Sequence, residues 1–142
     1  MRLKGSIKKH GVTILVDSGS THNFLNPTLA KQCGCKVTFT DQFRVTVGDE
    51  GVINSSGKCY DVPVSIQGFQ FQLDFYLLPV SGCDIVLGAE WLQSLGAILW
   101  DFSKLTMQFS WKGHNVQLIG NGSSPTILAD QGEFKRLLLQ EK

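Results

Sequence analysis

The chain has 142 residues, with 13 basic and 12 acidic side chains and a formal net charge of +1. Hydrophobic residues make up 42% and charged residues 18%, which excludes a disordered chain and suffices for one domain with a buried core. The balanced charge excludes a bulk field for binding nucleic acid or an anionic membrane. The longest apolar runs are too short to span a bilayer, and the charged N-terminus lacks the apolar stretch of a secretory signal.

The cysteines indicate a reducing compartment rather than a disulfide or metal framework. None lies in a C-x-x-C pair, and the histidines are scattered along the chain. The residues concerned are Cys33, Cys35, Cys59 and Cys83, with His10, His22 and His114. We therefore expect reduced, mostly buried thiols, no metal and no cofactor, in an intracellular, cytoplasmic protein.

Alternation of apolar and polar residues predicts most of the secondary structure. It indicates three β-hairpins: residues 2–8 with 12–16 around a turn at 9–11, residues 62–66 with 69–77, and residues 105–111 with 116–119. In the second hairpin Val62, Val64 and Ile66 share one face, so that face is expected to be buried.

Helical signals are few. Asn26 followed by Pro27 is typical of a helix start and Gly34 of a helix end, which predicts a helix over residues 27–33. A second helix is predicted over residues 89–95, ended by Gly96. The fold class is therefore all-β with two short helices, a small closed or orthogonal barrel. We expect this domain to cover residues 1–120, followed by a linker at 121–126 and a polar helix at 127–142.

A weak internal repeat suggests approximate two-fold symmetry inside the domain. Residues 14–19 (ILVDSG) and 84–88 (DIVLG) each carry an apolar strand into a glycine turn that leads towards a short helix. The second turn could cross behind the first.

The segment most typical of a catalytic site begins at Asp17. An apolar strand delivers this carboxylate into a turn of small and hydroxyl residues, namely Ser18, Gly19, Ser20 and Thr21. Such a strand gives a general base a rigid support, and glycine allows another backbone to approach closely. Alone the triplet is weak, because Asp, Ser and Gly are common in turns.

Together with its companion segments, the chain resembles the retropepsin-like aspartic proteases, in particular the protease region of plant gypsy-class LTR retrotransposon polyproteins. The matching segments are ILVDSGSTHNFLNP (14–27), FRVTVGDEG (43–51), FYLLPVSGCDIVLGAEWLQSLG (75–96) and AILWDFSKLTMQF (97–109). The resemblance covers roughly residues 1–120 and implies a small closed acid-protease barrel.

It also implies a homodimer. These proteases activate a water with two carboxylates that share one proton, and this chain has a single D-S-G turn. Asp17 of each subunit would therefore meet at the two-fold axis and hydrolyse an extended peptide or polyprotein. Ser18 would hold the two turns together, Gly19 would allow the approach, and Ser20 would hydrogen-bond the outer oxygen of the carboxylate.

The resemblance assigns two further elements of the cleft. The flap over the substrate would be Val47, Gly48, Asp49, Glu50 and Gly51, whose two acidic residues replace the small residues usual at this tip. The cleft floor would be Ile85, Val86 and Leu87, with Gly88 in the crossing loop.

Several residues have simpler interpretations. His22 receives no role, Asp84 fits a strand-start carboxylate, and Trp91 and Leu92 fit a helix core. An apolar cluster is expected from Trp100, Phe102, Phe109 and Trp111. Two alternatives stay open: a catalytically inactive domain of the same fold that serves in dimerisation or peptide binding, favoured by the acidic flap tip, and a small barrel that binds an apolar ligand.

Overall fold

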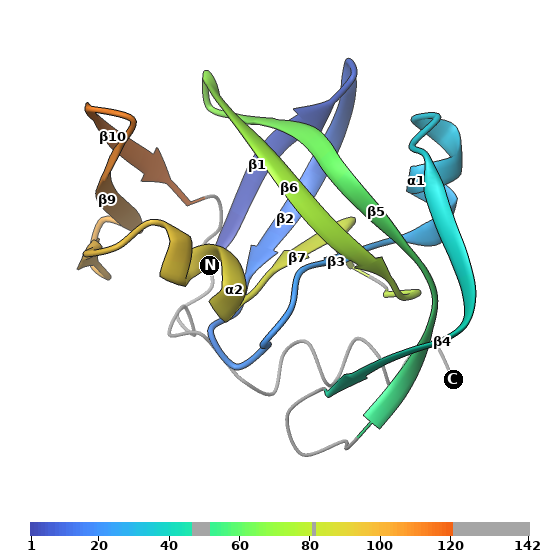
Figure 1. The fold of residues 1–142 in the computed structure, drawn as a ribbon. Coiled ribbons are helices and arrows are strands. Elements are labelled where there is room, and N and C mark those ends of the chain that lie inside the picture. The colour runs from blue at the N-terminus through green and yellow to red at the C-terminus, as the bar shows by residue number, and fades with distance from the viewer. Residues whose placement is uncertain (47–51, 81, 121–142) are drawn as a thin grey trace.

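The computed structural model describes residues 1–46, 52–80 and 82–120, and these residues form a mostly β fold (Figure 1). The strands are β1 (Arg2–Ile7), β2 (His10–Val16), β3 (Phe24–Leu25), β4 (Val37–Thr46), β5 (Val52–Ile66), β6 (Phe69–Leu77), β7 (Ile85–Leu87), β8 (Leu99–Asp101), β9 (Thr106–Trp111) and β10 (His114–Ile119). The helices are α1 (Pro27–Gln32) and α2 (Ala89–Ser94). The predicted all-β class with two short helices is confirmed.

The larger sheet closes on itself. Its strand order is β1-β2-β7-β3-β6-β5-β4, and β1 also pairs with β5, so six strands form a barrel. The strand β5 is 15 residues long and continues beyond the barrel as the partner of β4 (Figure 1). A separate three-stranded sheet, β10-β9-β8, follows α2 along the chain. The expected closed barrel is therefore present.

The three predicted hairpins are confirmed, with shifts at the first turn and at the third, where β10 begins at His114. The pairs are β1 with β2, β5 with β6 and β9 with β10, all antiparallel. The first hairpin turns at Lys8 and Lys9, earlier than predicted, because these two residues take the positive φ angles of 46° and 74°. Such angles give the two-residue turn that matches strand twist.

The two helices start and end close to the predicted residues. The Asn26 side chain accepts a hydrogen bond from the Thr28 N–H, which caps α1. Helix α2 buries Trp91, whose ring lies 5.8 Å from Phe71 and 6.3 Å from Phe109 in edge-on contacts. The prediction that Trp91 belongs to the core is confirmed, and this contact fastens α2 to both the barrel and the second sheet.

The predicted cluster of four aromatic residues is confirmed for Trp100, Phe109 and Trp111, which share one hydrophobic core, and is wrong for Phe102. Phe109 and Trp111 pack against Phe71 of the barrel, at 6.4 and 5.2 Å between ring centres. Trp100 also packs against this core, whereas Phe102 is exposed and stacks on Trp100 at 6.1 Å. The reason is that Phe102 begins the turn between β8 and β9, whose next two residues are exposed as well.

Some predictions fall outside the described residues: the linker at 121–126, the helix at 127–142 and the flap tip at 47–51.

All four cysteines are free thiols, and three of them are buried. Among the residues that the structure describes, no helix has the length and apolar character needed to cross a membrane.

Candidate active site

Asp17 follows the last residue of β2, where a parallel neighbour fixes its backbone. β2 pairs with β7 through Val16 and Leu87, and the Asp17 N–H donates to the Leu87 carbonyl at 3.0 Å. The turn then folds back, since the Gly19 N–H donates to Asp17 Oδ1 at 2.8 Å. The carboxylate is therefore oriented by its own turn. In the single chain Asp17 is buried, with 1% of its surface exposed.

The loop after Asp17 crosses a second loop at Gly88, as expected from the sequence. A Cβ atom on Gly88 would lie 2.4 Å from the Ser20 carbonyl oxygen and 2.5 Å from that of His22. Directly after it, the Ala89 N–H donates to Ser20 O at 2.7 Å and the Glu90 N–H to Thr21 O at 3.0 Å. Only glycine permits this approach, so α2 is fastened to the candidate active-site turn.

Asn23 holds the same crossing from inside, and sequence reasoning missed it. Its side chain is buried; Oδ1 accepts from the Gly88 N–H at 3.0 Å, and Nδ2 donates to the Asp74 carbonyl at 3.3 Å. Asn23 thus links the Asp17 loop, β7 and β6. A polar residue immediately before an apolar strand was the available signal, but asparagine there equally fits an ordinary turn.

The hydroxyl residues of the turn divide between two surroundings. Ser18 and Thr21 are exposed, whereas Ser20 is buried and its hydroxyl donates to the His22 carbonyl oxygen at 2.9 Å. The predicted hydrogen bond from Ser20 to the carboxylate is therefore wrong in this chain, because a hydroxyl has one hydrogen and the nearby carbonyl takes it.

The predicted cleft floor consists of core residues. Ile85, Val86 and Leu87 are fully buried; the first and last pack in the barrel core, and Val86 packs in a second cluster with Leu15 and Phe24. Strand β7 lies between β2 and β3 within the sheet. Its three residues form the layer beneath the turn.

The strands β4 and β5, on either side of the predicted flap, pair up to Thr46 and Val52. Val47, Gly48, Asp49, Glu50 and Gly51 lie outside the described residues. Where β5 leaves the barrel, the oxygen of the buried Ser55 hydroxyl accepts from the Leu77 N–H at 3.1 Å, and its one hydrogen is shared between the carbonyl oxygens of Gly57 at 2.7 Å and Leu77 at 2.8 Å.

Asp84 has a structural role, as expected. Its Oδ2 accepts from the Thr13 N–H at 2.8 Å, and its own N–H donates to Thr13 O at 2.9 Å. It therefore begins the β2–β7 pairing that Asp17 ends. Within residues 1–46, 52–80 and 82–120, no three His, Cys, Asp or Glu side chains gather as a metal site.

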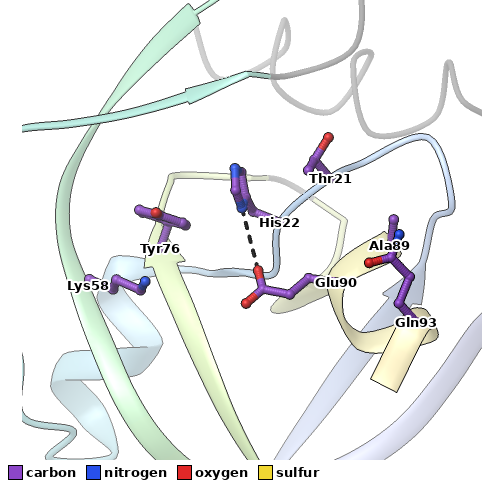
Figure 2. Close-up of a pocket in the computed structure, with 7 residues that line it drawn as sticks. All are labelled: Thr21, His22, Lys58, Tyr76, Ala89, Glu90 and Gln93. Carbon is purple, nitrogen blue, oxygen red and sulfur yellow. Dashed lines mark hydrogen bonds and ion pairs between the residues drawn. The ribbon is translucent and has the colours of Figure 1, made fainter. Parts of the chain in front are cut away.

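A pocket of about 280 Å³ lies beside the turn (Figure 2). Its lining residues come from the Asp17 loop, β5, β6 and α2: Thr21, His22, Lys58, Tyr76, Ala89, Glu90 and Gln93. His22 Nδ1 lies 3.5 Å from Glu90 Oε2, and the His22 ring packs edge-on against Tyr76 at 5.0 Å. No role for His22 was predicted from the sequence, whereas here it lines the pocket between α2 and β6 (Figure 2).

Comparison with known proteins agrees with this arrangement. Residues 5–112 match the family model described as retroviral aspartyl protease. The retroviral protease-like domain of Ddi1 from Leishmania major superposes with a TM-score of 0.61 at 16% identity, covering 87% of this chain and 96% of that one. A retropepsin-like aspartic protease from Rickettsia conorii gives 0.50 at 18% identity, covering 70% and 75%.

No curated protein sequence matches the chain significantly. At these identities the two solved structures show the fold, and the family match covers most of the described chain. A closed barrel, an apolar strand that ends in Asp-Ser-Gly and a glycine crossing behind it accompany that match. The chain therefore belongs to the retroviral aspartyl protease family.

Proposed function

We propose that the protein is an aspartic endopeptidase that works as a homodimer, with Asp17 of each subunit activating one water molecule. The observation that carries this proposal is the fixed position of Asp17, held between the Leu87 carbonyl and the Gly19 N–H. A pre-oriented carboxylate at the end of a rigid strand is what general base catalysis requires. One such turn per chain calls for a second copy.

The reaction follows from two carboxylates that share one proton. The ionised carboxylate removes a proton from the water, and the protonated carboxyl donates to the scissile carbonyl oxygen. The water attacks the carbonyl carbon, the peptide C–N bond then breaks, and the leaving nitrogen takes the proton that the first carboxylate removed from the water. The exposed Ser18 is available for a hydrogen bond between the two turns.

The substrate we propose is an extended peptide within a gypsy-class LTR retrotransposon polyprotein, on the basis of the resemblance carried by residues 14–27 and 75–96. The four free thiols support a reducing, cytoplasmic site of action. Neither nucleic acid nor a membrane is a partner in this proposal.

A second candidate function is an inactive domain of the same fold that binds peptides or dimerises. Two observations favour it: Asp17 is 1% exposed in the single chain, and the Ser20 hydroxyl donates its hydrogen bond to the His22 carbonyl oxygen. Catalysis requires the carboxylate to reach substrate, so this alternative predicts binding without cleavage.

The deciding experiment is a fluorogenic peptide assay across pH with matched variants. Asp17→Asn is expected to lower kcat/KM by at least about 100-fold, the lower end for loss of a general base, whereas Asp84→Asn retains activity. Pepstatin should inhibit the wild type. Equal activity of Asp17→Asn and wild type would refute the proposal, and peptide binding without cleavage would favour the second candidate.

Mixing tests the dimer separately. If each active site needs Asp17 from both subunits, equal amounts of wild type and Asp17→Asn that exchange freely leave roughly half of the activity expected from the wild-type subunits alone. A monomeric enzyme would lose none. Sedimentation of the same mixture reports whether the subunits associate.

A further inference from the structure

The pocket in Figure 2 carries charges that the cleavage reaction does not use. One wall comes from α2, with Glu90, and the opposite wall from β5 and β6, with Lys58 and Tyr76. The loop residues Thr21 and His22 lie between them (Figure 2). A hollow with polar groups on two sides is suited to hold one side chain of a ligand.

The ionisable groups of the pocket differ in the partners that they contact. Glu90 faces His22 at 3.5 Å, whereas Lys58 Nζ lies over the rings of Tyr76 at 4.6 Å and Tyr60 at 4.9 Å. Across the described part of the chain, no carboxylate comes within ion-pair distance of Lys58. Aromatic faces attract a cation without accepting its three N–H hydrogens in strong hydrogen bonds. Lys58 therefore offers a positive charge to a ligand.

Backbone hydrogen bonds fasten both walls to the candidate active-site loop. The Tyr76 N–H donates to Asn23 O at 2.9 Å, and the Glu90 N–H donates to Thr21 O at 3.0 Å. The pocket thus begins four residues after Asp17, on the same loop. Each residue of an extended peptide advances about 3.3 Å, so a side chain within a few residues of the bond cut at Asp17 can reach a pocket on the same loop.

We propose that this pocket is a subsite that selects an acidic side chain in the bound peptide, with Lys58 as the specificity-determining residue. The proposal rests on the proposed function in that the peptide lies across Asp17. The Lys58 ammonium group supplies the positive charge, and Thr21 and Gln93, which line the same pocket, carry further O–H and N–H groups. A basic side chain is disfavoured, because Lys58 repels it and Glu90 already has a hydrogen-bond partner in His22.

Binding to the full-length Asp17→Asn variant tests the pocket without cleavage. The probes are short fluorescein-labelled peptides with Glu at each position in turn, and matched peptides with Gln, measured by anisotropy well above the ordinary carboxyl pKa of about 4.3. At one position Glu is expected to bind about fivefold tighter than Gln, as a partly exposed ion pair allows. The preference should weaken at high salt.

Three variants in the same background identify the residue responsible. Lys58→Met should remove the preference, and Lys58→Glu should shift it to a peptide with Lys at that position. Lys112→Glu is the matched control, because Lys112 Nζ also lies over an aromatic ring, that of Trp111 at 5.8 Å, but outside the pocket. Thermal melting confirms that each variant is folded.

The outcomes separate this inference from the proposed function. Equal affinity for Glu and Gln at every position, absence of peptide binding, or a preference that survives Lys58→Met would overturn the inference, even for an active protease. If the preference depends on Lys58 but the wild-type protein cuts no peptide, the inference about the pocket would be supported and the proposed catalysis would be wrong.

Discussion

Asp17 and Asp84 lie at opposite ends of the same pair of parallel strands, and their surroundings differ. Asp84 comes before β7 and its carboxylate bonds the neighbouring strand, at the Thr13 N–H. Asp17 comes after β2 and its carboxylate is oriented by its own turn, through Gly19. The comparison teaches that a carboxylate at the start of a strand is used for pairing, while one at the end is left to the loop that follows.

The two segments in which a strand leads into a glycine turn, residues 14–19 and 84–88, differ as well. After Asp17 the chain runs through a loop and β3 before α1 begins, whereas Gly88 leads into α2 at once. Gly88 has no open space, because the carbonyl oxygens of Ser20 and His22 lie against it. The second segment therefore provides the close crossing, and the first provides the carboxylate.

The largest effect is expected from closing that crossing. Gly88→Ala places a methyl group against two backbone oxygens. The Ser20 oxygen cannot move without breaking its bond from the Ala89 N–H, and the His22 oxygen cannot move without breaking its bond from the Ser20 hydroxyl. We expect a loss of at least about 3 kcal/mol in the free energy of unfolding, measured by urea denaturation.

The matched control is Gly11→Ala. Gly11 is exposed, with no atom near the position of an added Cβ. We expect its stability to stay within about 0.5 kcal/mol of the wild type. If both variants lost the same stability, the crossing would not depend on glycine.

The next effect compares the two carboxylates directly. Asp84→Ala leaves the half-buried Thr13 N–H without its charged acceptor and should cost about 2 kcal/mol. Asp17→Asn keeps an oxygen that accepts from the Gly19 N–H, so its stability should change by less than about 1 kcal/mol. Urea denaturation of both variants checks this, and a larger loss in Asp17→Asn would reverse the assigned roles.

The sequence was sufficient where structure is local. Hairpins such as β5–β6 follow from alternating residues, and α1 follows from Asn26 and Pro27. The sequence was not sufficient for β4 or for the first half of β5, where polar residues such as Asn54 and Ser55 interrupt any alternation. These strands form because each pairs with the other.

The candidate site divides in the same way. Asp17 and its turn could be recognised, since the motif is contiguous. The partner of Ser20 could not be predicted, because a hydroxyl selects among acceptors that only the folded loop brings near. Asn23 and Lys58 also depend on contacts between segments far apart in the sequence, and no local pattern announces such contacts.

The smallest expected effect on stability comes from two cysteine thiols, one buried and one half-buried. Cys59 is 1% exposed in the barrel, and burial raises the pKa of its thiol from about 9.0 to about 11, with Cys35 contributing. Burial also raises the pKa of Cys35, which is only half-buried. A raised pKa means that the folded protein holds the proton more tightly than the unfolded chain does.

The stability that this proton contributes is complete below pH 9 and is lost as the pH rises towards 11. The loss from Cys59 should be on the order of 1 to 2 kcal/mol. Urea denaturation of wild type and Cys59→Ala across this range measures it, because lysines and tyrosines titrate in both proteins and cancel in the difference. The free energy of unfolding should fall less steeply with pH in Cys59→Ala than in the wild type. Equal slopes would show that the Cys59 thiol ionises in the folded barrel as readily as in the unfolded chain.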